Sequence, residues 1–397
     1  MAIEIRTATD DDWEAICRAD GRAFGFSYTA DEMAERRPVH DLSRFRIALD
    51  GTQIVSTSGS YALDVTLPGA VSVPMGGVTW VSTVATHRRQ GIMRQTVEAV
   101  HDDIDQRGEP LATLSASEGG IYEHLGYGLS TRSRVTTIDT RLASIRPEYR
   151  PNPGDVRYLD PADVIPTVSA LWERFRRCRG GEISRASELH ELMFAVFGRD
   201  DGPLGAAHYL SHRDGYAMYR TEQHWNDGHP AHVLHLVEIA AVTPEAHAAL
   251  WHTLLSIDLA AEIRSRCIPI DDPLPFLLDN QRALRTTDLN DGIWVNVRDA
   301  SICFGARTYR TNDRIVIEED GKRWAIEGGP DGASCRAVRT RPDLLTSHAW
   351  FSSLLYGGMQ PSALVAGGRM TARNADVLNR ADLFFPTSLA PHCQTHY

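Results

Sequence analysis

Residues 81–94 read Val-Ser-Thr-Val-Ala-Thr-His-Arg-Arg-Gln-Gly-Ile-Met-Arg, and this stretch decides the fold class. A β-branched, apolar run that includes Val78, Trp80 and Val84 predicts a strand. A basic turn, residues 87–91, interrupts the apolar pattern. Apolar residues at helical spacing come after the turn, at Met93, Val97, Val100 and Ile104. The stretch therefore predicts a strand, a basic turn with a glycine, and a helix.

This arrangement is suited to binding a pyrophosphate group. The first N–H groups of a helix have no partner within the helix, and its N-terminus carries a partial positive charge. Gly91 leaves room for a close approach to the backbone, and Arg88 and Arg89 add full charges. A surface turn with a chance pair of arginines would look the same, so the prediction depends on the residues C-terminal to the turn.

The basic turn resembles the acetyl-coenzyme A loop of the GNAT acetyltransferases, whose pattern is Gln/Arg-x-x-Gly-x-Gly/Ala. Arg88, Gly91 and Met93 stand at those places, and Met93 departs from the usual small residue. In GNAT enzymes the next elements are a strand and a short helix with a tyrosine, four residues before a Gly-aromatic pair. The expected strand 111–115 and residues Tyr122, Gly126 and Tyr127 match that order. The alternative for Tyr122 is a core tyrosine at a helix–strand corner.

Longer blocks resemble one branch of these enzymes, the enhanced intracellular survival (Eis) family of N-acetyltransferases. The blocks are 116–128, 250–259, 291–299 and the end of the chain, 382–397. The resemblance implies an α/β (α+β) protein with a GNAT domain over residues 1–150. A second, degenerate GNAT-like domain without a cofactor site is expected over 151–287, after the proline-rich stretch 151–154. A sterol-carrier-like α+β domain is expected over 288–397, with a helix from Pro342.

The resemblance also implies roles for individual residues around acetyl-coenzyme A. Backbone groups of Val81, Ser82 and Thr83 are expected to pair with the pantetheine chain as an added strand would. The remaining residues expected at the cofactor are Arg88, Arg89, Gln90, Gly91, Ile92, Met93, Arg94, Ser117 and Glu118. Tyr122 is expected to protonate the departing thiolate, which suits a phenol that keeps its proton at neutral pH. The aromatic loop with Phe24, Phe26 and Tyr28 is expected to line the acceptor pocket, although a packed helix connection fits it equally well.

The last residue is the candidate general base. A primary amine is mostly protonated at neutral pH and must lose a proton to attack a thioester. In the Eis family the chain end returns to the catalytic pocket, and its free carboxylate is thought to take this proton. Tyr397 would supply that carboxylate here, and the apolar, proline-containing segment 382–391 favours a docked tail over a solvated one.

Composition and charge restrict the function further. The net charge of −11 argues against nucleic-acid binding as the main task and suits basic substrates. Six cysteines without paired spacing indicate reduced thiols, and neither cysteines nor histidines show the spacing of a metal site. We see no signal peptide and no apolar run of membrane-spanning length, so we expect a cytoplasmic protein without a membrane partner.

The sequence therefore predicts an acetyl-coenzyme A-dependent N-acetyltransferase whose acceptor is a small-molecule or peptide amine. Aminoglycoside-type polyamines, lysines and other primary amines all remain open as acceptors. Phe26 and His396 stand where aminoglycoside-modifying relatives carry acids, and the loss of two carboxylates would weaken the binding of a polycation, so an apolar amine or a monoamine also stays open. The resemblance implies a homohexamer, with Trp350, Phe351 and Tyr356 as aromatic surface. The alternative is a non-enzymatic scaffold that binds a lipid or a partner through its C-terminal lobe.

Overall fold

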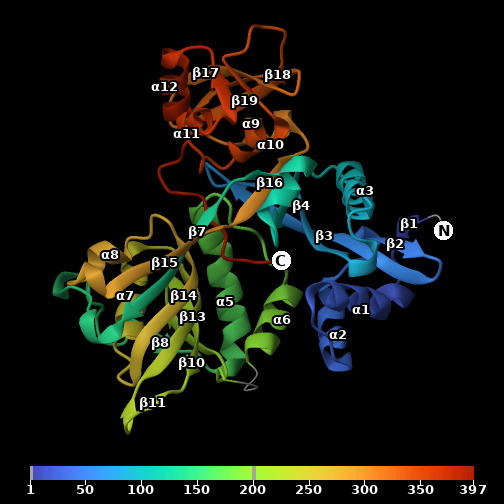
Figure 1. The fold of residues 1–397 in the computed structure, drawn as a ribbon. Coiled ribbons are helices and arrows are strands. Elements are labelled where there is room, and N and C mark those ends of the chain that lie inside the picture. The colour runs from blue at the N-terminus through green and yellow to red at the C-terminus, as the bar shows by residue number, and fades with distance from the viewer. Residues whose placement is uncertain (1–2, 199–202) are drawn as a thin grey trace. The chain divides into compact units, whose positions relative to one another are not determined.

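The computed structural model describes residues 3–198 and 203–397 (Figure 1). The chain forms two compact units. One contains the residues up to Thr131, Gly292–Ser388 and Thr395–Tyr397, and the other contains Arg132–Asp291 and Leu389–Gln394. The expected divisions at residues 150 and 287 stay a prediction, because the units observed are not continuous in sequence. None of the described helices is both long and apolar enough to cross a membrane.

The first unit is built on a seven-stranded sheet. Its strands, in spatial order, are β1 (Glu4–Thr7), β2 (Arg46–Asp50), β3 (Gln53–Leu67), β4 (Val71–Thr83), β5 (Leu111–Ser115), β16 (Ile293–Val297) and β6 (Gly128–Leu129). Its helices are α1 (Trp13–Phe24), α2 (Ala30–Arg36), α3 (Ile92–Gln106) and α4 (Gly119–Tyr122). The expected strand, turn and helix around residues 81–94 are confirmed as β4, a turn and α3 (Figure 1).

Strand β4 carries a bulge at Trp80. Its register against β3 shifts between the pairs Thr57↔Ser82 and Gly59↔Thr79, and Trp80 has φ +52°, a left-handed conformation that is unfavourable for a bulky residue. Ring packing stabilises this conformation, because the Trp80 indole stacks on Tyr28 with centroids 5.7 Å apart. The bulge turns β4 away from the course of its neighbours.

Two strands, β16 and β7, lie in a different sheet from the one that their position in the sequence predicts. Strand β16, expected in the C-terminal domain, lies between β5 and β6 in the first sheet, with Val295 paired to Thr113 and Gly128. Strand β7 (Arg132–Asp139), expected in the first domain, lies in the second sheet between β14 (Ala260–Pro269) and β15 (Leu284–Asp291). Pairings between segments that are about 130 to 180 residues apart depend on tertiary contacts, which a local hydrophobic pattern does not report.

The second unit is built on another seven-stranded sheet, with a β-hairpin beside it. The sheet order is β15 (Leu284–Asp291), β7, β14 (Ala260–Pro269), β13 (His232–Ala241), β10 (Gly215–Glu222), β9 (His208–His212) and β8 (Arg157–Tyr158). The hairpin consists of β11 (Trp225–Asn226) and β12 (His229–Pro230), and the helices are α5 (Pro161–Phe175), α6 (Ser187–Phe197), α7 (Pro244–Leu255) and α8 (Leu274–Leu277). The Thr243 side chain caps α7 by accepting from the Ala246 N–H.

The C-terminal part of the first unit carries a five-stranded sheet. Its strands are β19 (Gly332–Ala337), β18 (Lys322–Gly329), β17 (Asp313–Glu319), β20 (Leu344–Thr346) and β21 (Met370–Ala372), with helices α9 (Ala300–Ala306), α10 (His348–Ser353), α11 (Pro361–Ala366) and α12 (Ala375–Phe384). The expected helix from Pro342 is wrong at its start, because residues 344–346 pair in parallel with β17. Phe351 and Tyr356 are fully buried, so the expected aromatic surface is wrong for these two residues.

Candidate functional site

The candidate site lies where β4 and β5 separate. These strands run parallel and pair only at Gly76↔Ala112 and Gly77↔Thr113, although β4 continues to Thr83. From Val78 onward β4 is paired on its β3 side alone, so the edge that faces β5 is open. An open edge of this kind accepts an extended chain as an additional strand.

Two tyrosines lie at the point where β4 and β5 separate, which we call the β4–β5 vertex, and they approach it from opposite faces of the sheet. The Tyr397 hydroxyl lies 2.5 Å from Thr113 Oγ1, and a Cβ on Gly77 would lie 3.0 Å from the Tyr397 ring. Tyr122 packs in one cluster with Val78 and Leu114, the next residues on each strand. Because successive side chains of a strand point to opposite faces, Tyr397 and Tyr122 flank the vertex on its two sides.

Tyr122 is held in a buried, largely apolar position at the end of α4. Its side chain is 5% exposed, and its ring packs edge-to-face against Tyr127 with centroids 6.0 Å apart. Burial raises the pKa of the Tyr122 phenol, a hydrogen bond with Ser117 lowers it, and the charge of Glu118 raises it. The phenol is therefore protonated at neutral pH. The structure thus brings together Ser117, Glu118 and Tyr122, three residues that the sequence analysis placed near the thioester.

Tyr127 has a structural task beside it. It is fully buried, and its hydroxyl lies 2.7 Å from Nε2 of His101 on α3. Gly126, in a left-handed conformation with φ +87°, lets the chain turn from Tyr122 to Tyr127. The Gly-aromatic pair thus fixes the helix that carries Tyr122 against α3.

The start of α3 has the form of an anion-binding cradle. Gly91 is its N-cap residue with φ +76°, and no side chain caps the helix. A Cβ at Gly91 would meet no atom within 4 Å, so the space in front of the helix is open. Arg89 and Arg94 are exposed and form no ion pair with any residue in the described ranges. The first N–H groups of α3 and these two side chains therefore fit a pyrophosphate.

The other residues of the turn have different environments. The Arg88 guanidinium donates to the carbonyls of Thr83 and Ala23, at 3.2 and 3.1 Å, so it closes the turn against the end of α1. Gln90 is exposed, Met93 is half-buried and Ile92 is buried in the core. Of the side chains predicted here, Arg89 and Arg94 are thus better disposed than Arg88 to reach a phosphate.

The register of β4 distinguishes the three residues expected at the pantetheine. Val84, the residue after β4, donates its N–H to the carbonyl of Val55 in β3 at 2.9 Å. Backbone groups alternate between the two sides of a strand, so those of Thr83 and Val81 face the open edge. Those of Ser82 face β3, and its hydroxyl contacts Thr57 Oγ1 at 2.8 Å.

An aromatic wall extends from the α1–α2 connection to Trp80. Phe24 and Phe26 are 51% and 47% exposed, and Phe26 packs edge-to-face on Tyr28 with centroids 4.9 Å apart. Tyr28 donates its hydroxyl to Asp20 at 3.0 Å, and burial raises the pKa of Asp20 to about 6. The loop is therefore an exposed aromatic surface at its tip and a packed connection at its base.

Sequence reasoning missed several residues around this wall. His40 is buried with its Nδ1 2.6 Å from the Arg36 carbonyl and its Nε2 2.9 Å from the Tyr61 hydroxyl, and the Tyr61 ring packs edge-to-face against Tyr397. A carbonyl only accepts, so Nδ1 carries the proton and Nε2 accepts from Tyr61. The Arg36 guanidinium lies 5.6 Å from the Tyr28 ring centroid. No local motif marks these residues, because they come from separate elements.

The chain is similar to known proteins over nearly its whole length. Two matches to families described as "Acetyltransferase (GNAT) domain" cover residues 4–130 and 169–298, and a "Sterol carrier protein domain" matches 310–394. An uncharacterized N-acetyltransferase of Streptomyces avermitilis is 32% identical over 98% of both chains. N-acetyltransferase Eis of Mycobacterium tuberculosis is 29% identical over 98% of both. The crystal structure of Eis1 from Mycobacterium abscessus has a TM-score of 0.87 at 28% identity, covering 99% of this chain and 100% of that one.

The chain belongs to the Eis family of GNAT N-acetyltransferases. It is an N-acetyltransferase, and acetyl-coenzyme A is its cosubstrate. The expected architecture of two GNAT domains and a sterol-carrier-like domain is confirmed. Because the chain is an enzyme, the alternative of a non-enzymatic scaffold does not hold.

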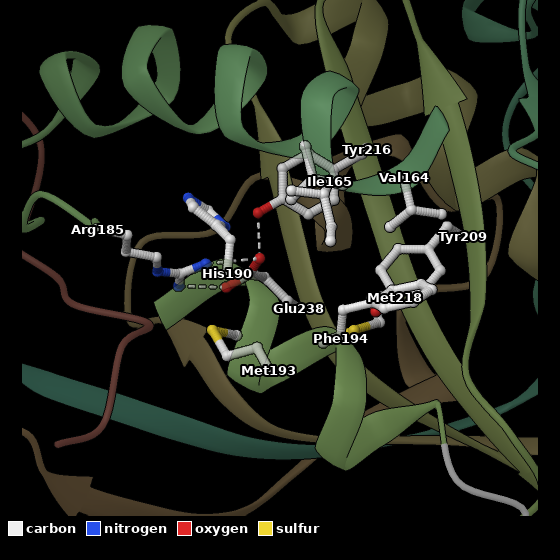
Figure 2. Close-up of a pocket in the computed structure, with 11 residues that line it drawn as sticks. Val164, Ile165, Arg185, His190, Met193, Phe194, Tyr209, Tyr216, Met218 and Glu238 are labelled. Atoms are coloured by element: carbon white, nitrogen blue, oxygen red, sulfur yellow. Dashed lines mark hydrogen bonds and ion pairs between the residues drawn. The ribbon is translucent and has the colours of Figure 1, made fainter. Parts of the chain in front are cut away.

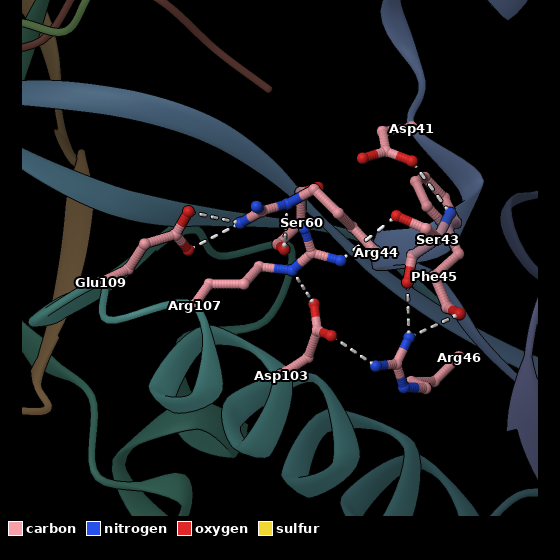
Figure 3. Close-up of polar contacts among 9 residues, drawn as sticks. All are labelled: Asp41, Ser43, Arg44, Phe45, Arg46, Ser60, Asp103, Arg107 and Glu109. Carbon is pink, nitrogen blue, oxygen red and sulfur yellow. Dashed lines mark hydrogen bonds and ion pairs between the residues drawn. The ribbon is translucent and has the colours of Figure 1, made fainter.

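A buried ion-pair network fixes the vertex in this Eis-family enzyme (Figure 3). Arg44, 3% exposed, donates from Nη2 to both carboxylate oxygens of Glu109 at 2.9 and 2.6 Å, and from Nε to the Ser60 carbonyl at 3.1 Å. Glu109 joins α3 to β5, and a Cβ on Gly76 would lie 3.2 Å from its Oε2. The network therefore ties β3 to the α3–β5 connection beside the first β4–β5 pair.

Proposed function

We propose that the enzyme transfers the acetyl group of acetyl-coenzyme A directly to a primary amine. Tyr122 acts as the general acid and the C-terminal carboxylate of Tyr397 as the general base. One observation carries the proposal, namely that these two residues flank the β4–β5 vertex from opposite faces. A thioester at the vertex would then have a proton donor on one side and a proton acceptor on the other.

Each residue would move one proton. The acetyl thioester supplies the acyl group, and the amine forms the new C–N bond while the C–S bond breaks. The Tyr397 carboxylate takes the proton that the amine loses, and Tyr122 gives its proton to the departing sulfur. The raised pKa of Tyr122 supports this role, because it keeps the phenol protonated until a thiolate forms beside it.

The remaining site residues would hold the cosubstrate. Val81 and Thr83 would pair with the pantetheine chain along the open edge of β4. The start of α3, with Arg89 and Arg94, would bind the pyrophosphate, and Gln90, Gly91, Ile92 and Met93 would contribute through their backbone. Arg88 would keep the turn in place, and Ser117 and Glu118 would lie beside Tyr122 near the thioester.

For the acceptor we propose a primary amine on an apolar or aromatic body. The exposed rings of Phe24 and Phe26 form a wall with Tyr28 that suits an apolar group. The positive charge of Arg36 beside Tyr28 disfavours a polycation, and position 26 lacks a carboxylate. Aminoglycoside-type polyamines and lysine peptides are the competing acceptors. A screen of coenzyme A release across arylalkylamines, polyamines, aminoglycosides and lysine peptides distinguishes them, and equal kcat/KM for all classes would contradict the preference.

The acid and the base are tested separately. Tyr122→Phe removes one oxygen, and we expect kcat to fall on the order of 10²-fold with unchanged affinity for acetyl-coenzyme A. Appending one glycine after Tyr397 displaces the carboxylate by about 3.5 Å of chain and leaves every side chain unchanged. We expect this extension to reduce kcat/KM sharply. Normal turnover by the first variant would make Tyr122 structural, and normal turnover by the second would remove the base assignment.

Two further proposals concern the assembly and its location. We infer a homohexamer from the likeness to the Eis family, and light scattering at micromolar concentration tests it, since a 44.0 kDa particle would contradict it. We infer a cytoplasmic enzyme, because all six cysteines carry free thiols. Fractionation of cells that express the protein tests the location.

A further inference from the structure

The second unit repeats the strand divergence of the first. Its strands β13 and β14 run parallel, and their last pair is Leu236↔Ser265, although β13 continues to Ala241 and β14 to Pro269. On its other side β13 stays paired with β10 to the end. The segment Val237–Ala241 therefore has an open edge, which corresponds to the edge of β4 that we assign to pantetheine.

The helix after this edge is closed to an anion, unlike α3. The Thr243 side chain accepts from the Ala246 N–H at 3.2 Å, and Pro244 occupies the first helical position. A proline has no N–H, and the capped N–H is no longer available, so two of the helix-start donors are missing. The second divergence thus lacks a pyrophosphate cradle.

The C-terminal tail fills this divergence instead. Ile239 of β13 donates its N–H to the Gln394 side-chain oxygen at 3.3 Å. On the opposite strand, the Cys267 thiol lies 3.4 Å from the Cys393 carbonyl. Residues of the tail therefore contact both strands where they separate, and the Gln394 side chain occupies a backbone donor on the open edge of β13.

A second segment, residues 179–185, also binds the tail. Arg179 donates to the Ala390 carbonyl at 2.6 Å, and Asp271 accepts from the Ala390 N–H at 2.8 Å. The carbonyl of Gly180 accepts from the His392 N–H at 3.0 Å, and Glu182 accepts from the Gln394 N–H at 3.2 Å. Alternate tail residues are thus bonded to residues 179–182 or to Asp271.

This second segment is itself fixed to β13. The buried Arg185 guanidinium donates to both oxygens of Glu238, at 3.1 and 2.5 Å (Figure 2). It also lies 3.3 Å from the Trp172 ring centroid. Tyr216 donates its hydroxyl to the same carboxylate. The small pocket in Figure 2 is lined by Arg185, Glu238, Tyr216, His190 and apolar side chains, and Arg185 and Glu238 pair with each other. The ion pair between Arg185 and Glu238 therefore anchors segment 179–185 to β13.

We propose that the second GNAT domain is a clamp for the C-terminal tail. Residues 390–394 would occupy the divergence of β13 and β14, the place that corresponds to the cofactor site of the first domain. Arg179, Glu182 and the Ile239 edge act as positioning groups. Tyr397 comes only a few residues after Gln394, so the clamp limits the reach of the terminal carboxylate. The proposal rests on the proposed role of that carboxylate, and it explains why a second domain without a phosphate cradle is useful to the enzyme.

The test measures how often the tail leaves the clamp. Carboxypeptidase A releases an aromatic C-terminal residue only from an undocked chain end, and mass spectrometry follows the loss of Tyr397 from the full-length protein. Gln394→Met keeps the length of the side chain and removes the acceptor for Ile239. Loss of one hydrogen bond changes an equilibrium about fivefold, so we expect release to be about fivefold faster. Adding Arg179→Met should bring the acceleration to about fiftyfold.

Controls separate the clamp from general stability. Ser388→Ala lies just before the clamped segment, on an exposed residue, and should release Tyr397 at the wild-type rate. Tm and acetyl-coenzyme A affinity should be unchanged in Gln394→Met, which carries the test alone if the double variant does not fold. Release at the wild-type rate in a folded Gln394→Met protein overturns the clamp.

Residual acetyl transfer, measured on the same samples, tests the proposed function independently. Activity that declines in step with the release of Tyr397 supports both the clamp and the carboxylate. Accelerated release with full residual activity would support the clamp and refute the carboxylate as general base.

Discussion

The contact between Gly77 and Tyr397 allows a sharp test of the vertex. A Cβ built on Gly77 lies 3.0 and 3.3 Å from Cε2 and Cδ2 of the Tyr397 ring, and 2.8 Å from Cδ1 of Leu63. Carbon atoms in contact are about 3.5 Å apart or more. Gly77→Ala would therefore push the ring, or the strand, by about 0.5 Å.

The tyrosine has little freedom to absorb this shift. Its hydroxyl is held by Thr113, and its ring packs edge-to-face against Tyr61 with centroids 6.4 Å apart. Leu63, in contrast, can change rotamer at its end. A displacement of about 1 Å can reduce a rate by about 100-fold, so we expect Gly77→Ala to reduce kcat about tenfold. Overpacking should lower the free energy of unfolding by roughly 1 kcal/mol.

The assay is coenzyme A release with a saturating amine, with acetyl-coenzyme A affinity measured by calorimetry. We expect the affinity to stay within about twofold, because the added methyl group faces Tyr397 and Leu63. Gly305→Ala is the matched control, since its nearest neighbouring atom would lie at an ordinary 3.6 Å. The double variant Gly77→Ala/Leu63→Ala removes the contact with Leu63 but keeps the contact with Tyr397, so its kcat should stay low. A Gly77→Ala enzyme with normal kcat would refute the placement of Tyr397 at the reacting groups.

Three further expectations concern charge. Replacing Arg89 and Arg94 by Gln should raise the Kd for acetyl-coenzyme A about tenfold and weaken its dependence on salt; an unchanged Kd would remove the cradle. Arg44→Met leaves Glu109 buried without its partner and should destabilise the protein by about 3 kcal/mol in thermal melts, whereas Arg44→Met with Glu109→Leu should recover most of it. Burial raises the pKa of Asp20 from 3.8 to about 6, so the folded state holds this proton more tightly and stability falls as pH rises from about 4 to 6. Asp20→Asn should therefore be more stable than wild type at pH 7.5, by an amount on the order of 3 kcal/mol, and the gain should vanish below pH 4; a gain that did not depend on pH would contradict the shift.

The sequence by itself determined the local elements around the cofactor. The β-branched run before residue 84 predicts β4, the spacing of Val97, Val100 and Ile104 predicts the buried face of α3, and Gly91 marks the start of the helix. These features depend on interactions over a few residues, which periodicity and capping rules describe. The Asp50-Gly51 turn between β2 and β3 was predictable for the same reason.

Only the tertiary structure decided which distant residues meet. Tyr397 reaches Thr113 across 284 residues of sequence, β16 enters the first sheet between β5 and β6, and the Gln394 side chain of the tail accepts from Ile239 at the edge of β13. Arg88 has the residue type that a phosphate needs, yet its donors are used by carbonyl groups, whereas Arg89 and Arg94 face solvent. Strand pairing and hydrogen-bond partners depend on the register and packing of whole sheets, so a local pattern of residue types leaves them open.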